Sequence, residues 1–211
     1  MTGSFGDFAE KATRAGVATE RTLDAFRSAR RETYLPLENA RDAYADRILP
    51  IPCGQIAERP IDALAITEAA SFDTSDRVLE IGTGTGFLTH VIAQLAGHVL
   101  TIDRYHTLLS ISRDRHAENR LSNVEHRQLD GALSDGLDGT FDRIICTVAF
   151  EEPPRPWLDL LVGGGSAIAP IGPRGGPQTI MRLTKVGARY EREPLGHCWF
   201  SPAESGIAAL L

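Results

Sequence analysis

Apolar residues at helical spacing mark the N-terminal part of the chain. Between residues 5 and 31 these positions include Phe8, Ala12, Val17, Leu23 and Phe26, with polar and charged residues among them. A stripe of this kind is typical of a helix that buries one face. Gly16 interrupts the stripe, so the pattern predicts two helices broken near that residue.

The next stretch has no regular period. Prolines at positions 36, 50 and 52 exclude a long helix across residues 34–52, because proline lacks the backbone N–H and restricts the residue before it. Helical spacing returns over residues 60–70, where Pro60 stands in the first turn that tolerates it.

From residue 77 onward, short apolar runs alternate with helical patterns. The runs predict strands over 77–81, 98–102, 124–129, 141–146 and 164–170, and the segments between them predict helices over 86–96, 105–119 and 154–162. Such alternation predicts an α/β fold, with a mostly parallel sheet covered by helices on both faces. Three further short runs, 179–185, 190–194 and 198–200, predict antiparallel strands at one edge of the sheet.

The segment over residues 77–86 carries the first chemical signal. A short apolar run ends in Glu80, and Gly82, Gly84 and Gly86 follow before a helical pattern. Strand, glycine turn and helix form the opening unit of a nucleotide-type cofactor site, because a residue without a Cβ lets the backbone turn sharply and approach a ligand. The spacing is G-x-G-x-G rather than the G-x-G-x-x-G of dinucleotide sites. Together with the acid at the strand end, it favours S-adenosylmethionine over NAD.

Further candidate ligands follow the other predicted strands, whose carboxyl ends meet at one edge of a parallel sheet. Asp103 ends the second strand roughly 20 residues after Gly82, the spacing of an acid that binds ribose hydroxyls. Asp130 ends the third strand, where a carboxylate can accept the adenine amino group. The predicted cofactor-binding residues are Glu80, Gly82, Thr83, Gly84, Gly86, Asp103, Arg104, Asp130, Gly131 and Thr147.

The charge of the ligand supports this choice of cofactor. S-adenosylmethionine carries a sulfonium cation and no phosphate, so it tolerates an acid-rich site, whereas a pyrophosphate would sit badly beside Glu80. The alternative is that these acids are ordinary turn and cap residues, the more common role of a single Asp. Two acids at the ends of successive predicted strands, next to a glycine turn, are harder to explain as turn or cap residues.

Composition and charge exclude other classes of function. The 211-residue chain has a formal net charge of -6, and its densest basic stretch, residues 27–31, is flanked by acids and predicts a solvated helix face rather than a nucleic-acid contact.

No apolar run is long enough to cross a bilayer, and early acids without an apolar core argue against a secretory signal. Cys53, Cys146 and Cys198 lack zinc or C-x-x-C spacing and the histidines are scattered, so no metal site is expected. We expect a cytoplasmic protein without membrane or nucleic-acid partners, and the sequence leaves its oligomeric state open.

Blocks of sequence outside the glycine turn carry a more specific signal. Residues 42–51 read Asp-Ala-Tyr-Ala-Asp-Arg-Ile-Leu-Pro-Ile, and Gly54, Gln55 and Pro60 follow. With residues 78–86, 129–131, 141–145 and 161–165, this set resembles the protein-L-isoaspartate O-methyltransferase family. The similarity runs in register from about Arg31 to Phe200, which is most of the chain.

The resemblance implies a Rossmann-like S-adenosylmethionine methyltransferase fold, with residues 1–60 as an N-terminal helical extension and acceptor loop and residues 61–211 as one methyltransferase domain. It implies methyl transfer to the side-chain carboxylate of L-isoaspartyl (D-aspartyl) residues in a damaged protein or peptide, leaving S-adenosylhomocysteine. The ester would then cyclise to a succinimide, which can reopen to normal aspartate. A carboxylate is already ionised at neutral pH, so positioning rather than a strong base would supply most of the catalysis.

The acceptor loop departs from the family. The family has G-Q-T-I-S-x-P there, with hydroxyls that contact the substrate carboxylate, whereas this chain has Ile56 in place of the threonine and Glu58 in place of the serine. Two like charges about 4 Å apart repel by about 4 kcal/mol at an effective dielectric constant of about 20. An inward Glu58 would therefore oppose an anionic substrate.

Three interpretations of this loop are open. Arg59 turns inward to pair with the substrate while Glu58 faces solvent, or Glu58 is the general base for a neutral nucleophile, or the two residues are a solvated pair on a drifted loop. Glu58 and Arg59 are thus the candidate catalytic residues. Residues 147–154 and 200–203, on the substrate side in the family, have also drifted. The alternatives to an isoaspartyl methyltransferase are a methyltransferase of the same fold with another acceptor, or a homologue that binds S-adenosylmethionine without turnover.

Overall fold

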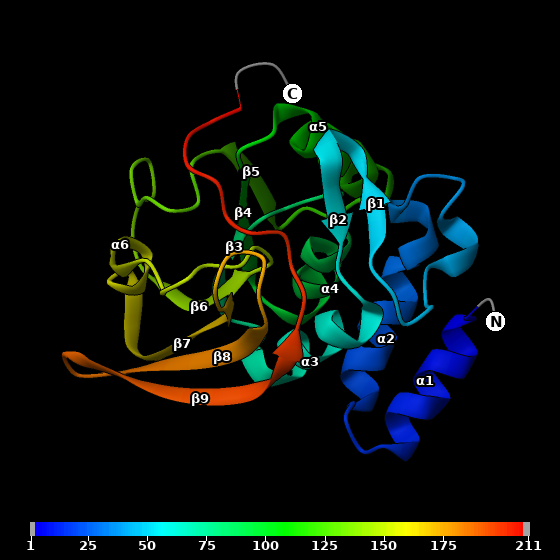
Figure 1. The fold of residues 1–211 in the computed structure, drawn as a ribbon, viewed down its shortest axis with the longest axis horizontal. Helices are drawn as coiled ribbons and strands as arrows, with labels where there is room; N and C mark the ends of the chain where they lie inside the picture. The colour runs from blue at the N-terminus through cyan, green and yellow to red at the C-terminus, as the bar shows by residue number, and fades with distance from the viewer. Residues whose placement is uncertain (1–2, 209–211) are drawn as a thin grey trace.

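A computed structural model describes residues 3–208, and a seven-stranded sheet lies at its centre (Figure 1). The strand order is β5-β4-β3-β6-β7-β8-β9. Strands β3 to β7 pair in parallel, and β8 and β9 are added antiparallel at one edge, as the sequence predicts. The strands are β3 (Arg77–Ile81), β4 (His98–Asp103), β5 (Val124–Gln128), β6 (Phe141–Cys146), β7 (Leu161–Ile171), β8 (Gln178–Val186) and β9 (Arg189–Cys198).

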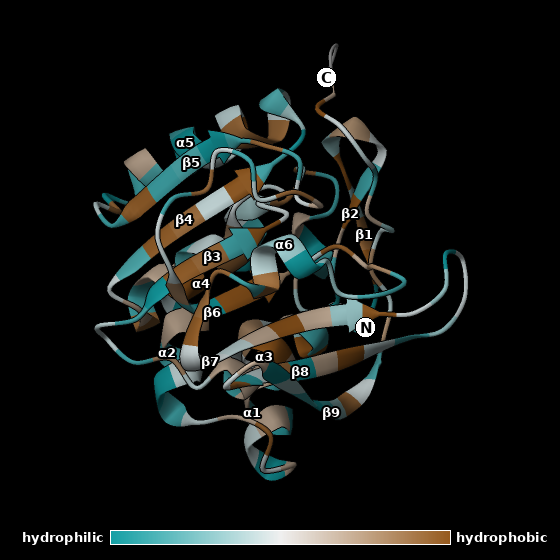
Figure 2. Cartoon of the chain, turned by 90° about the vertical axis from the view of Figure 1, so that its left-hand side faces the viewer, coloured by the Kyte–Doolittle hydropathy of each residue, from teal (hydrophilic) through white to brown (hydrophobic). Residues whose placement is uncertain are grey.

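Alternate residues of the central strands enter two different hydrophobic clusters. Val78, Val99 and Ile145 pack with the helices of one face, and their neighbours Leu79, Leu100 and Ile144 pack on the other. This alternation follows from the two-residue period of a strand, and both sets are hydrophobic because each face is covered. Figure 2 shows the resulting hydrophobic bands along β3, β4 and β6.

The first face carries most of the helices. They are α1 (Phe5–Arg14), α2 (Glu20–Ala29), α3 (Pro60–Ala70), α4 (Phe87–Leu95) and α5 (His106–Glu118). The second face is covered by α6 (Arg155–Leu158) and by connecting segments, with Trp157 fully buried in the second cluster. None of the helices within residues 3–208 is long and apolar enough to cross a membrane.

Most predicted elements are confirmed, and the differences have local causes. The helix predicted over 154–162 is wrong beyond its first turn, because Leu161 pairs with Phe141 and begins β7. The two strands predicted over 190–194 and 198–200 are instead one strand, β9. The irregular proline-rich stretch holds a small antiparallel ribbon, β1 (Leu49–Ile51) and β2 (Gln55–Ala57), joined by the short 3-10 helix Pro52–Gly54.

The N-terminal helices pack against the helix that follows the glycine turn. Phe26 of α2 is fully buried and meets the Phe87 ring edge-on, with ring centroids 5.3 Å apart. Phe8 of α1 stacks on Phe26 at 6.1 Å. One hydrophobic cluster thus contains residues from both sides of position 60, and the division into an N-terminal extension and a methyltransferase domain stays a prediction.

Removal of the Phe26 ring tests how far the two parts fold together. We expect Phe26→Ala to lower the free energy of unfolding by about 3–5 kcal/mol, because the ring leaves a cavity beside α4. Urea denaturation followed by circular dichroism measures the change. The exposed Val17→Ala is the control and should shift stability by less than about 0.5 kcal/mol. Two separate transitions, of which Phe26→Ala moves only one, would show that the N-terminal part unfolds independently.

Candidate active site

The glycine turn after β3 has a backbone that glycine adopts readily. Gly82, Gly84 and Gly86 have φ angles of 98°, 53° and 94°, in the left-handed region that other residues avoid. A Cβ on Gly82 would also collide with the hydroxyl of Thr147, which follows β6. Thr147 donates from its N–H to the Ile81 carbonyl at 2.9 Å and from its hydroxyl to the Gly82 carbonyl at 2.5 Å. The loops after β3 and β6 therefore touch.

Asp103, at the end of β4, holds the glycine turn from the neighbouring strand. Its carboxylate accepts hydrogen bonds from the Gly84 N–H at 2.9 Å and from the Tyr105 N–H at 3.0 Å. Burial raises the pKa of Asp103, and these N–H groups act against that shift. Asp103 also lines the main cavity described below, and its contact with ribose hydroxyls stays a prediction.

Glu80 lies behind the turn rather than in front of it. Its carboxyl group is fully buried, and one oxygen accepts hydrogen bonds from the hydroxyls of Thr89 at 2.5 Å and Thr101 at 2.6 Å. Burial raises the pKa of Glu80 to about 8, so most of the group is neutral at pH 7. The carboxyl group lines neither cavity. Glu80 therefore supports the turn from the core, whereas the sequence predicted that its charge lies beside the ligand.

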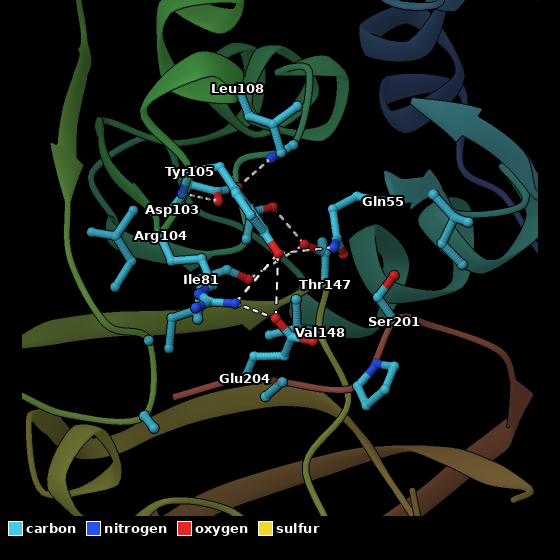
Figure 3. Close-up of a pocket in the computed structure, with 18 of the residues that line it drawn as sticks. Gln55, Ile81, Asp103, Arg104, Tyr105, Leu108, Thr147, Val148, Ser201 and Glu204 are labelled. Carbon is cyan, nitrogen blue, oxygen red and sulfur yellow. Dashed lines mark hydrogen bonds and ion pairs between the residues drawn. The ribbon is translucent and has the colours of Figure 1, made fainter. Parts of the chain in front are cut away.

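The main cavity, of about 660 Å³, lies where the carboxyl ends of β3, β4, β5 and β6 meet (Figure 3). This is the edge at which open parallel sheets bind their ligands. The predicted residues that line it are Gly82, Gly84, Asp103, Arg104, Gly131 and Thr147. Asp130, Thr83 and Gly86 do not line it, and Thr83 instead faces a second, smaller cavity.

Asp130 holds the C-terminal segment instead of facing the cavity. Its two oxygens accept hydrogen bonds from the Ala132 N–H at 2.8 Å and the Gly206 N–H at 2.6 Å. Its neighbours Gly131 and Ala132 provide the cavity wall at this point. A contact between the Asp130 carboxylate and adenine therefore stays a prediction.

The C-terminal segment covers one side of the main cavity. Ser201, Pro202 and Ala203, in a stretch that the family resemblance sets on the substrate side, line the cavity together with Glu204. Glu204 pairs with Arg104 and accepts a hydrogen bond from the Tyr105 hydroxyl at 3.3 Å. Gln55 of β2 donates to the same hydroxyl at 3.2 Å. Figure 3 shows these four side chains converging from β2, the end of β4 and the C-terminal segment. No sequence pattern marks Glu204 or Tyr105, because their roles arise only when distant segments meet.

The acceptor loop places Glu58 and Arg59 in opposite settings. The Glu58 side chain is 13% exposed, and its Oε1 accepts a hydrogen bond at 3.1 Å from Arg31, whose side chain is 1% exposed. Arg59 instead makes a two-point pair with Asp62, at 2.8 and 2.7 Å, and lines neither cavity. The interpretations with an inward Arg59 or with a solvated Glu58–Arg59 pair are therefore wrong for this structure.

Glu58 lines the second cavity, of about 430 Å³, which we call the acceptor-loop cavity. It adjoins the main cavity at the glycine turn, because Gly82, Gly84 and Thr147 line both cavities. Because Arg31 is a permanent cation, the charge of Glu58 is balanced from within the protein. The repulsion expected from the sequence is correspondingly reduced.

A histidine cluster, His90, His116 and His126, lies behind the start of α4. The Gly86 carbonyl can only accept, so Nε2 of His116 donates to it at 2.8 Å and Nδ1 of His116 accepts from Nε2 of His126 at 2.9 Å. Nδ1 of His90 hydrogen-bonds the Tyr34 hydroxyl at 2.7 Å. Burial lowers the pKa of His116, and it lowers the pKa values of His90 and His126 to about 4. The cluster therefore supports the glycine turn as neutral imidazoles.

Within residues 3–208, no three His, Cys, Asp or Glu side chains gather as metal ligands.

Comparisons with known proteins agree with this geometry. The family model described as Protein-L-isoaspartate(D-aspartate) O-methyltransferase matches residues 7–208. A protein-L-isoaspartate O-methyltransferase of Bradyrhizobium sp. is 40% identical over 195 residues, covering 92% of this chain and 91% of the relative. One from Rhodopseudomonas palustris is 40% identical over 196 residues, covering 92% and 90%. The crystal structure of a Plasmodium falciparum protein-L-isoaspartate O-methyltransferase in complex with S-adenosyl-L-homocysteine has a TM-score of 0.83 at 18% identity, and the match covers 97% of this chain and 100% of that one.

The histidine cluster predicts a loss of stability in mild acid. The unfolded chain protonates a histidine near pH 6.5, whereas the folded chain keeps His126 and His90 neutral down to about pH 4. Between these pH values the unfolded state binds more protons, so the free energy of unfolding falls as the pH falls. Glu80, with its pKa raised to about 8, has the opposite effect, because its protonation stabilises the folded state as the pH falls. A histidine variant is needed to separate the contribution of the histidines from that of Glu80.

His126→Gln keeps an N–H donor toward His116 but does not titrate. We expect this variant to lose less stability than the unmodified protein when urea denaturation at pH 7.5 is compared with that at pH 5. Equal losses in the two proteins would contradict a neutral, buried His126.

Proposed function

The chain belongs to the protein-L-isoaspartate(D-aspartate) O-methyltransferase family, and we propose that it transfers a methyl group from S-adenosylmethionine to the side-chain carboxylate of L-isoaspartyl (D-aspartyl) residues in damaged proteins. The family resemblance predicted from the sequence is confirmed. The partner in this proposal is a protein or peptide with an isoaspartyl residue. The free cysteines and the repair of cellular proteins both favour a cytoplasmic location, which is part of the proposal.

The observation that carries the proposal is the main cavity at the glycine turn. S-adenosylmethionine supplies the sulfonium methyl group, and the cavity offers each part of its adenosine a partner of matching chemistry. We assign the ribose hydroxyls to the Asp103 carboxylate and the adenine ring to the lining formed by Leu129, Gly131 and Val148, all of which line the cavity with Asp103.

The chemistry requires alignment more than acid–base catalysis. A carboxylate nucleophile is ionised at neutral pH, and displacement at the sulfonium methyl consumes one carboxylate lone pair and leaves a neutral thioether. The protein has to hold the two reactants in line, which can supply about 7–11 kcal/mol of the barrier reduction. The rigid contact between the Gly82 turn and Thr147, and the covering segments on both sides, are suited to that task.

The pairing of Glu58 with Arg31 is compatible with an anionic acceptor. The buried guanidinium balances the charge of the carboxylate from within the protein, so Glu58 repels an anionic substrate less than an unpaired carboxylate would. The other candidates, a methyltransferase with a different acceptor and a homologue without turnover, make different predictions in the assay below.

Incubation with labelled S-adenosylmethionine and an isoaspartyl peptide, beside its aspartyl twin, tests the proposal. We expect a base-labile methyl ester on the isoaspartyl peptide alone. Gly82→Ala is the inactive control, because its Cβ collides with Thr147. Binding of S-adenosylmethionine without transfer to this peptide would favour the other candidates, and absence of binding would overturn the proposal.

Asp103 provides a separate prediction about affinity. We expect Asp103→Asn to weaken binding of S-adenosylhomocysteine about tenfold or more, because hydrogen bonds to a charged acceptor contribute about 1.5–3 kcal/mol and the amide leaves one backbone N–H without its acceptor. Isothermal titration calorimetry measures the change. Asp114→Asn, an exposed acid on α5, is the matched control, and equal affinities in both variants would show that Asp103 does not contact the ligand.

A further inference from the structure

The acceptor-loop cavity continues the main cavity past the glycine turn. Both cavities share Gly82, Gly84 and Thr147, and Ile51 and Ile56 of the β1–β2 ribbon line both as well. A ligand whose adenosine lies beside Asp103 can therefore extend along the turn into the acceptor-loop cavity, which Phe87 and Leu88 of α4 also line. In S-adenosylmethionine that extension is the methionine end, which carries an α-ammonium and an α-carboxylate group.

The lining of the acceptor-loop cavity contains one acid and one base. Among the described residues that line it, Glu58 is the single carboxylate and Arg31 the single cation, and the rest are apolar side chains, hydroxyls and glycines. Oε1 of Glu58 is taken by Arg31, and Oε2 has no hydrogen-bond partner among residues 3–208. A cationic group that enters this cavity thus meets one acceptor of opposite charge.

Arg31 is held so firmly that it fixes Glu58 in this place. Its Nε donates to the Ala43 carbonyl at 2.7 Å, its Nη2 donates to the Glu58 carbonyl, and its guanidinium lies 5.1 Å from the centre of the Phe87 ring. The guanidinium therefore binds both the backbone and the side chain of Glu58. The carboxylate is oriented before any ligand arrives, which lowers the entropic cost of binding.

The start of α4, which also lines this cavity, suits a negative group. Phe87 and Leu88, in the first turn of α4, line the cavity, and this helix has no side-chain cap at its N-terminus. The free N–H groups of a first turn attract an anion. A cavity lined by a carboxylate and by the uncapped first turn of a helix matches a zwitterionic amino acid group.

We propose that Glu58 is a specificity-determining residue of the cofactor site, whose free carboxylate oxygen accepts hydrogen bonds from the α-ammonium group of the methionine end of S-adenosylmethionine. This inference rests on the proposed function for the identity of the ligand. It gives Glu58 a role in binding the methyl donor rather than in proton transfer. It also explains how a carboxylate at the position of the family's serine is compatible with an anionic acceptor, because one oxygen is balanced by Arg31 and the other by the ammonium group.

Three ligands and two variants test the inference by calorimetry. The ligands are S-adenosylhomocysteine, its analogue with hydrogen in place of the α-ammonium group, and 5′-methylthioadenosine, which lacks the whole amino acid end. The variants are Glu58→Gln, which keeps an oxygen toward Arg31, and Glu32→Gln, which removes the same charge from a more exposed acid nearby. The urea midpoint of each variant shows that it is folded.

The expected result is a loss of binding affinity that depends on the ammonium group. Glu58→Gln should weaken the binding of S-adenosylhomocysteine about tenfold or more and change the affinity for the other two ligands by no more than about twofold. Glu32→Gln should change none of the three affinities. The unmodified protein should prefer S-adenosylhomocysteine over the deaminated analogue by a similar factor, and this comparison needs no variant.

Other outcomes distinguish a failure of this inference from a failure of the proposed function. If the unmodified protein binds S-adenosylhomocysteine but does not distinguish the deaminated analogue, or if Glu58→Gln weakens all three ligands equally, the inference is overturned and the proposed function stands. If the unmodified protein binds none of the three, the proposed function fails and the inference with it.

Discussion

The contact between Gly82 and Thr147 is the constraint on which the rest of the site depends. The loops after β3 and β6 meet there without room for a Cβ, and Thr147 binds the backbone of the β3 loop through both its N–H and its hydroxyl. The close approach brings the carboxyl ends of neighbouring parallel strands to one point. The main cavity and the acceptor-loop cavity adjoin at this contact, because Gly82 and Thr147 line both.

Buried polar groups hold the turn from the core. The Glu80 carboxyl group receives the hydroxyls of Thr89 and Thr101, and the histidine cluster reaches the Gly86 carbonyl through His116. A buried polar group without a partner is costly, so these bonds favour one arrangement of the turn over others. Both supports are largely neutral at pH 7, since burial raises the pKa of Glu80 and lowers the pKa values of the histidines. The charge presented to a ligand therefore comes from other residues.

Those residues are contributed by segments far apart in the chain. Asp103 follows β4, Arg104 is paired with Glu204 of the C-terminal segment, and Glu58 is paired with Arg31 from the end of the N-terminal helices. Each pair joins a covering segment to the site it covers. Desolvation makes an unpaired buried charge expensive, so Arg31 and Glu58 depend on each other, and the substitution in the acceptor loop is accommodated by a partner already present in the fold.

The sequence by itself determined most of the helices and strands and the part of the site that faces the methyl donor. The period of the apolar residues predicted most strands and helices, and the G-x-G-x-G turn with Asp103 predicted the cavity wall, because both are local signals set by backbone sterics and by a strand's end. Only the tertiary structure decided which way a side chain faces. Glu80 and Asp130 stand beside the turn and the strand end in sequence, yet one faces the core and the other the C-terminal segment. The sequence predicts an uncompensated charge at Glu58, whereas the fold brings Arg31, 27 positions earlier in the chain, beside it. Distances across the fold govern electrostatics, and no pattern along the chain encodes them.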